Sequence, residues 1–490
     1  MNYSFVSCDC GNSSTRVTLC RYDGRVITTR VILQEPNDAC KRGAYFYWDI
    51  MQIFAYLKKG IALAARETDR INSIGICTWG IDFALFDENM HMLADPLCYR
   101  NTLGKEELDK LPRSVQDAMF YRTGILSDRI NTVFMLKGIQ SKMPELMMQS
   151  KKLLLIPDLL NYFFTGRCYS EVSEASTTQL FDVRAGQYSG GQCAALGIDP
   201  GLFFPAAEHG TSLGLILPEI RRELHIGYDI PVVCVASHDT ASAVMGAPAE
   251  EETFAFISAG TWALIGLHCK EPFITEAALR RGFTNEAGAF GHITLLKNSI
   301  GLFIFQRLRA GYASEDGREM GWSEFEDLAE AYAGPELLFD VNHADFFNPP
   351  GMDEAVGNYL SRTGQLENAG RPAAVSAART SLAASFVRGI RDAGSISGLT
   401  FPRIVIVGGG ARSRRLMQMT ADISGMEVAA CGMECTSIGN ALAQAAFVCG
   451  GLSYGDLRSI AAASLDVQRY IPQSDKSGLL DRYGAIQHSS

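Results

Sequence analysis

A polar, glycine-containing turn that joins two apolar, strand-length runs occurs twice in this 490-residue chain. The first lies within 5–19 and reads Asp9-x-Gly-x-Ser-Ser-x-Arg, and the second joins 254–257 to 263–267 through Ser-Ala-Gly-Thr-Trp. Each pattern predicts a β-hairpin, since glycine frees the backbone for a tight turn. Amides, hydroxyl groups and a cation at such turns suit phosphate. We therefore expect two facing hairpins that clamp a polyphosphate from both sides.

Another apolar run, 232–236, predicts a short buried strand that ends in His238, Asp239 and Thr240. Small residues at 241–246 then begin a helix. A carboxylate at the carboxyl end of a strand, facing a helix start, is well placed for general-base work or for binding a metal. The simpler alternative is an aspartate that caps a helix beside an ordinary hairpin.

A third element is the run at 403–407, which leads into Gly408, Gly409 and Gly410 and then into a helix. The segment is not a Walker A loop, because no Gly-Lys-Ser/Thr follows, and Ser413 stands where the dinucleotide fingerprint needs its third glycine. After a strand and before a helix, the glycines let the backbone approach a ligand closely. Together with the two hairpins, they favour a nucleotide site over an ordinary turn.

Composition excludes several classes of protein. The 47% hydrophobic content and 47 glycines are typical of a large α/β enzyme, and the net charge of −10 argues against nucleic acid or an anionic membrane as partner. The chain lacks both a signal-peptide pattern and a run of eighteen apolar residues, so we expect a cytoplasmic protein. Its 13 scattered cysteines are expected to be buried thiols.

The same hairpins suggest two domains, at 1–244 and 253–470, with a polar joint that contains proline at 247–252. The remaining residues, 471–490, are expected to form a loose tail.

Taken in order, the motifs resemble those of the FGGY carbohydrate kinases, within the hexokinase–actin-like superfamily. They are Asp9-x-Gly…Arg16, Thr78-Trp-Gly-x-Asp82, His238-Asp-Thr240, Gly260-Thr-Trp262 and Gly408-Gly-Gly410. The resemblance runs from about residue 5 to about residue 455. It implies an α/β, two-domain, ribonuclease H-like fold with a catalytic cleft between the domains. Further segments resemble the rhamnulokinase branch: 47–50, 78–83, 156–166, 175–180, 296–302 and 347–349.

This resemblance implies an ATP-dependent kinase that phosphorylates the primary hydroxyl of a ketose, with L-rhamnulose converted to L-rhamnulose 1-phosphate. An L-fuculokinase or a xylulokinase-like enzyme is the alternative, and an actin-like ATPase without a sugar acceptor is a more distant one. The chain departs from the branch at 99–101 and 129–132, in segments expected to shape the sugar pocket. The sequence leaves monomer and homodimer open.

Residue roles follow from the resemblance. Asp239 would be the general base, and Asp9 and Asp239 would hold Mg²⁺. The sugar would contact Gly80, His238, Asp239, Thr240 and Asn298, with Trp79 and Asp82 close by. ATP would contact Asn12, Ser13, Ser14, Thr15, Arg16, Thr261, Gln306, Gly409, Gly410 and Asn440. Asn12 and Thr15 are themselves departures, since alanine and glycine are common at these positions.

Overall fold

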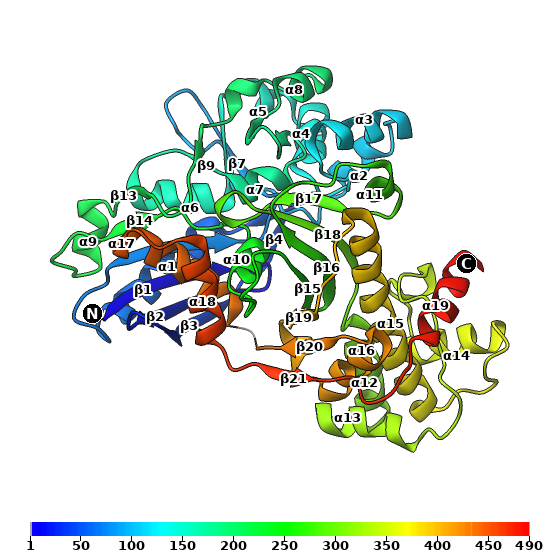
Figure 1. The fold of residues 1–490 in the computed structure, drawn as a ribbon. Coiled ribbons are helices and arrows are strands. Elements are labelled where there is room, and N and C mark those ends of the chain that lie inside the picture. Colours follow the sequence, from blue (N-terminus) through cyan, green and yellow to red (C-terminus); the bar gives the residue numbers. More distant parts are fainter. Residues whose placement is uncertain (1, 433, 490) are drawn as a thin grey trace. The chain divides into compact units, whose positions relative to one another are not determined.

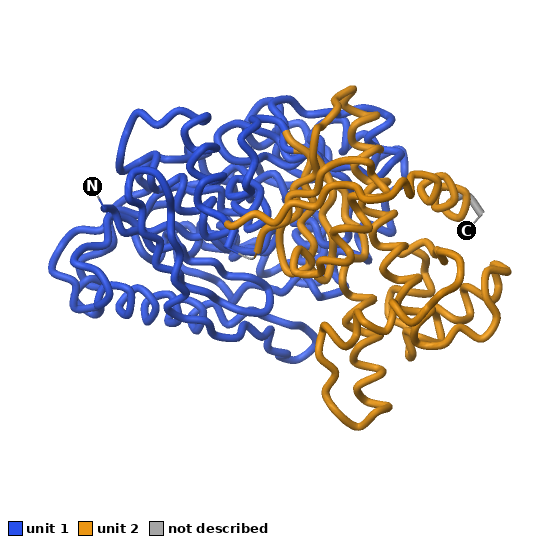
Figure 2. Tube along the Cα trace, turned by 60° about the horizontal axis from the view of Figure 1, so that its bottom comes forward, with its two compact units in different colours: residues 1–253, 268–295, 434–465 blue, residues 254–267, 296–433, 466–490 orange. Residues whose placement is uncertain are grey.

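The structure, a computed structural model, describes residues 2–432 and 434–489. The chain divides into two compact units, each assembled from separate stretches of sequence (Figure 2). Unit 1 comprises residues 1–253, 268–295 and 434–465, and unit 2 comprises residues 254–267, 296–433 and 466–490. Two stretches of the predicted second domain, 268–295 and 434–465, therefore belong to unit 1.

Unit 1 is built around a six-stranded sheet with the order β13-β14-β6-β1-β2-β3. These strands are β1 (Tyr3–Cys10), β2 (Ser14–Tyr22), β3 (Ile27–Pro36), β6 (Ser73–Thr78), β13 (Ser212–Leu215) and β14 (Pro231–Val233). The first predicted hairpin is confirmed, because β1 and β2 pair antiparallel with Asp9 opposite Arg16. β1, β6 and β14 are parallel, so their carboxyl ends meet at one edge of the sheet.

That shared edge collects residues from three distant parts of the sequence. The chain continues from β1 into Gly11, from β6 into Trp79 and Gly80, and from β14 towards His238. Past the end of β14, Thr78 forms a parallel bridge with His238, and its amide donates to the carbonyl of Ser237 at 2.7 Å. Strand topology therefore brings the predicted phosphate turn and two segments predicted to contact the sugar to the same edge of the sheet.

Helices cover this sheet with their apolar faces. α1 (Ile50–Ala65) buries Ile53, Leu57 and Ile61, which recur at the helical spacing, and the carboxylate of Asp49 caps its first turn by accepting from the amide of Gln52. The other helices of unit 1 are α2 (Leu103–Leu108), α3 (Arg113–Thr123), α4 (Thr132–Lys142), α5 (Pro144–Gln149), α6 (Ile156–Thr165), α7 (Val172–Thr177), α8 (Gly190–Leu196), α9 (Pro218–Glu223), α10 (Asp239–Met245), α11 (Glu276–Arg280), α17 (Cys435–Cys449) and α18 (Tyr454–Ser464).

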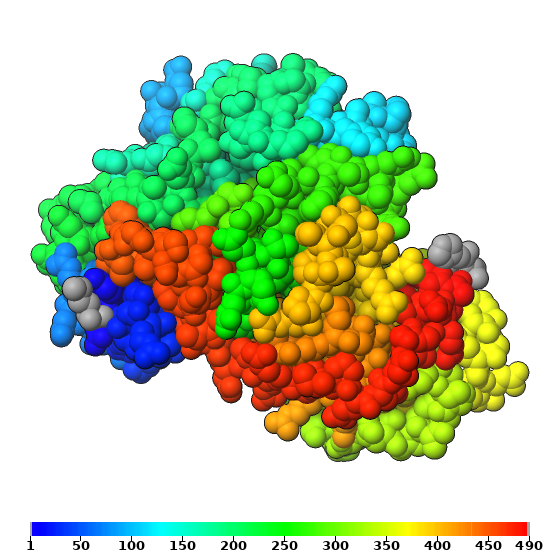
Figure 3. Space-filling view, viewed as in Figure 1, coloured from blue at the N-terminus to red at the C-terminus, as the bar shows by residue number. Residues whose placement is uncertain are grey.

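α17 and α18 return from late in the chain to complete unit 1 beside its first strands (Figures 1 and 3). Gln444 on α17 donates to the carbonyl of Val6 on β1 and accepts from the hydroxyl of Ser73 on β6. α17 also crosses α10 in backbone contact, since a Cβ at Gly439 would lie 1.9 Å from the carbonyl oxygen of Ser242. A side chain cannot fit at this crossing.

The second sheet has seven strands in the order β17-β18-β16-β15-β19-β20-β21. They are β15 (Phe254–Ala259), β16 (Trp262–Cys269), β17 (Thr284–Ala287), β18 (Ile293–Ile300), β19 (Arg403–Val407), β20 (Glu427–Ala430) and β21 (Gln468–Tyr470). β15 and β16 are the strands of the second predicted hairpin, and β19 is the strand predicted before the three glycines. Two-stranded pieces complete the molecule: β4 (Ala39–Arg42) with β5 (Tyr45–Trp48), β7 (Phe83–Phe86) with β8 (Lys152–Leu155), β9 (Ser170–Glu171) with β12 (Ala206–Ala207), and β10 (Phe181–Asp182) with β11 (Gln187–Tyr188).

Within unit 2, the long helix α15 (Arg371–Ser397) forms much of the core, and Leu382, Phe386 and Ile390 are buried on it at the spacing read from the sequence. The other helices of unit 2 are α12 (Phe303–Asp316), α13 (Trp322–Leu328), α14 (Met352–Arg362), α16 (Arg414–Ser424) and α19 (Gly478–Ser489). The prediction of a loose tail at 471–490 is wrong, because Leu480 and Tyr483 of α19 are buried. The helix α19 has twelve residues and buries its apolar side chains in the core of unit 2, which its largely polar composition does not indicate.

Two sequence-based expectations can be compared with the described residues. All 13 cysteines lie in the described part, and none forms a disulfide. Within residues 2–432 and 434–489, no helix combines the length and apolar character needed to cross a bilayer.

Candidate active site

Asp239 is the first residue of α10, at the shared strand edge of unit 1. Its side chain is 34% exposed, and its oxygen Oδ1 accepts a hydrogen bond from the hydroxyl of Thr240 at 3.1 Å. Burial of the carboxylate raises the pKa of Asp239 even though His238 and Thr240 lower it. An accessible carboxylate of increased basicity is suited to accepting a proton.

His238 precedes this carboxylate and lies between two acids. Its Nε2 is 3.7 Å from Asp239 Oδ1, and its Nδ1 is 3.2 Å from Glu286 Oε2 on β17. Burial lowers the pKa of His238, but Glu286 and Asp239 outweigh burial and raise the pKa to about 9. The imidazole is therefore a cation at neutral pH. Sequence reasoning missed Glu286, which no motif marks and which only the fold brings to His238.

Asp9 lies at the end of β1, and its carboxylate oxygen is 3.9 Å from the guanidinium of Arg16. Burial and the negative charge of Asp239 raise the pKa of Asp9 to about 7, while Arg16 lowers it. An acid whose proton affinity is raised by a second negative charge is one that a bound cation would stabilise in its ionised form. The structure thus brings Asp9 and Asp239, predicted to share a metal, into electrostatic contact.

The turn of the first hairpin offers both exposed and buried polar groups. Asn12 and Ser13 are exposed, and Ser14 and Arg16 are half-buried. Thr15 is fully buried and gives its hydroxyl proton to Asn37, which also donates to the carbonyls of Gly11 and Ser13. Thr15 therefore braces the turn instead of facing a ligand in this structure. Asn37, absent from the sequence prediction, is the residue that holds the turn in shape.

Gly80 begins a strained three-residue turn. The amide of Asp82 donates to the carbonyl of Gly80 at 3.0 Å, and Ile81 between them has φ of +77°, rare for a β-branched residue. A Cβ at Gly80 would lie 3.4 Å from His238 Nε2 and 3.1 Å from Thr177. Gly80 and His238, predicted to contact the same sugar, are therefore neighbours.

Asp82 is buried beneath this turn and accepts from the indole nitrogens of Trp48 and Trp79 at 2.6 and 2.9 Å. Burial raises the pKa of Asp82 to about 7 despite these hydrogen bonds. The rings of Trp48 and Trp79 lie 4.4 Å apart and both side chains are buried. Asp82 and Trp79 thus form a supporting network below Gly80.

On unit 2, the turn of the second hairpin packs on the beginning of α12. The carbonyls of Gly260 and Thr261 accept from the amides of Leu302 and Phe303, while the hydroxyl of Thr261 lies 3.3 Å from the amide group of Gln306. Thr261 and Gln306, both predicted to contact ATP, are therefore neighbours.

The three glycines after β19 differ in their surroundings. Gly408 has φ of +90°, which favours glycine, and a Cβ at Gly410 would lie 2.6 Å from the Cβ of Ala259. A Cβ at Gly409 would meet nothing within 4 Å. The close approach expected of a ligand at Gly410 is made by Ala259 of the hairpin, so Gly409 is the position left open.

Two predicted contact residues have surroundings that differ from those of the other predicted site residues. Asn298 is exposed on β18, in a stretch of unit 2, whereas the other predicted sugar residues belong to unit 1. Asn440 is fully buried in unit 1, where its side chain contacts Cys77 and accepts from Gln444. With no exposed surface in this structure, Asn440 acts as a core residue of α17.

Within the described residues, no group of three or more His, Cys, Asp or Glu side chains could hold a metal ion. This finding is compatible with Asp9 and Asp239, because Mg²⁺ commonly binds one or two carboxylates together with waters and the phosphates of the substrate. The negative charge that Asp239 exerts on Asp9 fits a divalent cation.

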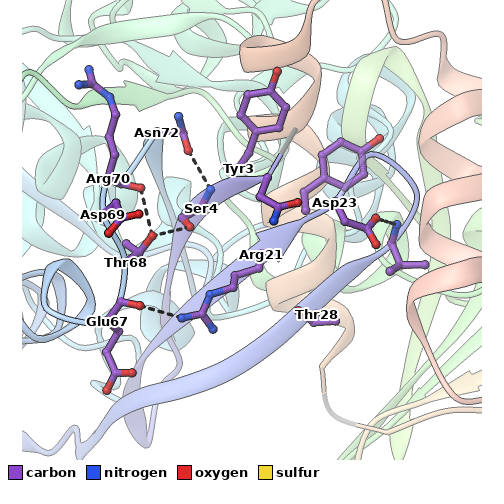
Figure 4. A pocket seen from close by; sticks show the side chains of 13 residues that line it. Tyr3, Ser4, Arg21, Asp23, Thr28, Glu67, Thr68, Asp69, Arg70 and Asn72 are labelled. Carbon is purple, nitrogen blue, oxygen red and sulfur yellow. Dashed lines mark hydrogen bonds between the residues drawn. The ribbon is translucent and has the colours of Figure 1, made fainter.

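A separate open pocket lies at the end of the unit 1 sheet where β1 begins, opposite the carboxyl ends of β1 and β6 (Figure 4). The polar groups inside it are bonded to one another. The amide of Ser4 donates to the side-chain oxygen of Asn72, the hydroxyl groups of Ser4 and Thr68 lie 2.8 Å apart, and Arg21 donates to the carbonyl of Glu67. It contains none of the predicted site residues.

Comparison with known proteins agrees with this arrangement. Residues 4–246 match the N-terminal domain, and residues 255–447 the C-terminal domain, of the FGGY family of carbohydrate kinases. The chain belongs to this family. It is therefore an ATP-dependent sugar kinase, and the family assignment made from the motifs is confirmed.

FGGY relatives extend over the whole chain. A rhamnulokinase of Bacteroides thetaiotaomicron is 31% identical over 479 residues, 96% of each chain, and a rhamnulokinase of Bacillus subtilis is 30% identical over 98% of each chain. Among solved structures, a xylulose kinase from Rhodospirillum rubrum has a TM-score of 0.81 at 17% identity, covering 100% of this chain and 98% of that one. Plasmodium falciparum glycerol kinase with ADP has a TM-score of 0.77 at 17% identity, covering 99% and 97%. The predicted two-domain α/β kinase fold is confirmed.

Proposed function

We propose that this kinase transfers the γ-phosphoryl group of ATP to the primary hydroxyl of L-rhamnulose, forming L-rhamnulose 1-phosphate. Asp239 carries the proposal of sugar phosphorylation, because it combines an accessible carboxylate, a raised pKa and a place beside His238, which is itself a neighbour of Gly80. The choice of L-rhamnulose is supported by full-length relatives named rhamnulokinase at about 30% identity.

In this proposal, Asp239 accepts the proton of the attacking hydroxyl, a role that typically accelerates a reaction by about 10²–10⁴-fold. Gly80, His238, Thr240 and Asn298 orient the sugar, and the cationic imidazole of His238 offers an N–H to a sugar oxygen. Because burial favours the protonated acid, Asp239 is a stronger base than an exposed aspartate.

Phosphate contacts in the proposal come from both hairpins. Asn12, Ser13, Ser14 and Arg16 would bind phosphate oxygens from the first, and Thr261 with Gln306 from the second. Gly409 would lie against the nucleoside, where its backbone has open space. Asp9 and Asp239 would hold Mg²⁺, which neutralises charge on the phosphates when bound.

The experiment is a steady-state comparison of L-rhamnulose, L-fuculose, L-ribulose and D-xylulose with ATP and purified enzyme. We expect the highest kcat/KM with L-rhamnulose, by about tenfold or more over the others. A preference for L-fuculose or D-xylulose would replace the proposed sugar and leave the kinase assignment intact. ATP hydrolysis that no ketose stimulates would overturn the proposed function.

A further inference from the structure

Helix α7 (Val172–Thr177) contributes three buried hydroxyl groups to unit 1. Each accepts a hydrogen bond from the backbone amide of a different segment. Ser173 accepts from His238 at 3.0 Å, Ser176 from Ala287 at 3.0 Å, and Thr177 from Ile81 at 3.1 Å. One six-residue helix therefore connects three stretches of chain that are far apart in sequence.

The protons of these hydroxyl groups are already committed elsewhere. Ser173 donates to the carboxylate of Glu171, Ser176 to the carbonyl of Ser173, and Thr177 to the carbonyl of Glu174, at 2.6 to 2.8 Å. Because each proton points into the helix, each oxygen is left to accept the amide from the neighbouring segment. The direction of all three contacts is thus fixed by the helix itself.

Each of the three amides adjoins a residue of the acceptor side, defined as the groups around the proposed sugar site in unit 1: Gly80, His238, Asp239 and Glu286. The amide of His238 precedes Asp239, the amide of Ala287 follows Glu286, and the amide of Ile81 follows Gly80. The third contact is made to a strained segment, since Ile81 has φ of +77°. Strained backbone persists only where its surroundings hold it. Here Thr177 binds the amide of Ile81, and Thr132 donates to its carbonyl at 2.6 Å.

A buried pair anchors the start of the helix. Glu171 accepts from the amides of Ser173 and Glu174 and from His209 Nε2 at 2.5 Å. Burial raises the pKa of Glu171, but the hydrogen bonds from His209 and Ser173 outweigh it and hold the pKa below its usual range. His209 Nδ1 accepts from the amide of Phe290, so the proton of the neutral imidazole resides on Nε2 and points to Glu171.

We propose that α7 is the positioning element of the acceptor side, and that Ser173, Ser176 and Thr177 set the relative places of Asp239, Glu286 and Gly80. The hydroxyl groups need not touch the sugar. They act by fixing the backbone on which the sugar-binding groups stand. This inference rests on the proposed assignment of Gly80 and His238 to the sugar.

The chain provides a matched control for a test of Thr177. Thr178 is its neighbour, is equally buried, donates to the carbonyl of Ala175 and accepts from the amide of Leu180. Thr178 therefore makes the same two kinds of hydrogen bond, but to a local turn. Thr177→Val and Thr178→Val each remove one hydroxyl at constant size, and Thr177→Ser retains the acceptor.

Steady-state kinetics and thermal unfolding should be measured on all three variants, with the ketose that the wild-type enzyme uses best. We expect Thr177→Val to lower kcat/KM for the ketose by about tenfold, through a higher KM, a lower kcat or both. The KM for ATP should stay within about twofold of wild type. Thr178→Val should lower the melting temperature similarly but leave both KM values near wild type, and Thr177→Ser should restore activity. Ser176→Ala should repeat the Thr177→Val result if that variant does not fold.

Equal kinetic losses in the two valine variants, in proportion to their loss of melting temperature, would overturn the inference and assign α7 a purely structural role. So would a rise in the KM for ATP as large as that for the ketose. A wild-type enzyme that prefers another ketose changes only the proposed substrate, because the variants are compared on that ketose.

Discussion

The two units present opposite kinds of candidate binding surface. Unit 1 offers charged side chains whose pKa values are displaced, with His238 raised to about 9 and Asp9 to about 7. Unit 2 offers a hairpin turn and three glycines, with Gly409 facing open space. The candidate surface of unit 1 depends on the charges of its side chains, and that of unit 2 depends on the space that glycines leave free of side chains. Substitutions should therefore act on unit 1 through charge and on unit 2 through volume.

The largest effect is expected from removing the charge of Asp239. Asp239→Asn keeps the shape but cannot accept a proton, so turnover should fall by at least about a hundredfold while ATP still binds. Steady-state kinetics and nucleotide titration on the same preparation would measure both. A variant that retained more than about a tenth of wild-type turnover would show that Asp239 is not the base.

Volume should decide the outcome at the glycines of unit 2. Gly409→Val is expected to raise the KM for ATP by about tenfold with little change in the KM for the ketose. The reason is that the valine side chain would fill the open space that the nucleoside is proposed to occupy. Gly410→Ala should instead lower the free energy of unfolding by about 1–3 kcal/mol, because its Cβ meets Ala259. Gly321, where a Cβ also meets open space in unit 2, provides the control. Gly321→Val should leave the KM for ATP and the KM for the ketose unchanged. If Gly409→Val resembled this control, the nucleotide would lie elsewhere.

The smallest effect concerns the ion pair between His238 and Glu286. The raised pKa of His238 stabilises the fold below about pH 6.5, and this contribution is lost as pH rises through about 9. Glu286→Gln should therefore lower stability by on the order of 1 kcal/mol at pH 6, since Asp239 remains near His238, and by little above pH 9. Urea unfolding at the two pH values measures the difference. A larger loss at the higher pH would contradict the assignment of charge.

The comparison also separates what the sequence predicts from what it conceals. Asp239, Thr261 and the glycines follow strands, and a strand followed by reactive or small residues is a local pattern. Glu286 and Asn37 lie within or beside strands with no such pattern, and only tertiary pairing brings them to His238 and to the first turn. The burial of Asn440 on α17 could not be predicted either, because nothing in the neighbouring sequence shows that other elements pack on that face of the helix.

Local patterns likewise reveal elements better than units. Both hairpins, the strand before Gly408 and the stripe on α15 are periodic over a few residues, and the structure contains them. The assignment of 268–295 and 434–465 to unit 1 depends on contacts between distant positions, which are 111 residues apart for Ala287 with Ser176 and 438 residues apart for Gln444 with Val6. Side-chain pattern within a segment cannot specify such a partner.

The crossing of α10 and α17 also constrains how the protein is made. Gly246 and Gly439 meet in backbone contact. Gln444 forms hydrogen bonds with Val6 on β1 and Ser73 on β6, two strands that are synthesised early. At about 5–20 residues per second, the first strands are synthesised roughly 20–80 s before the helix that completes their core. Unit 1 therefore cannot complete its core until most of the chain has been made. A nascent chain interrupted before residue 434 would have all six strands of the sheet but would lack α17, which packs on them.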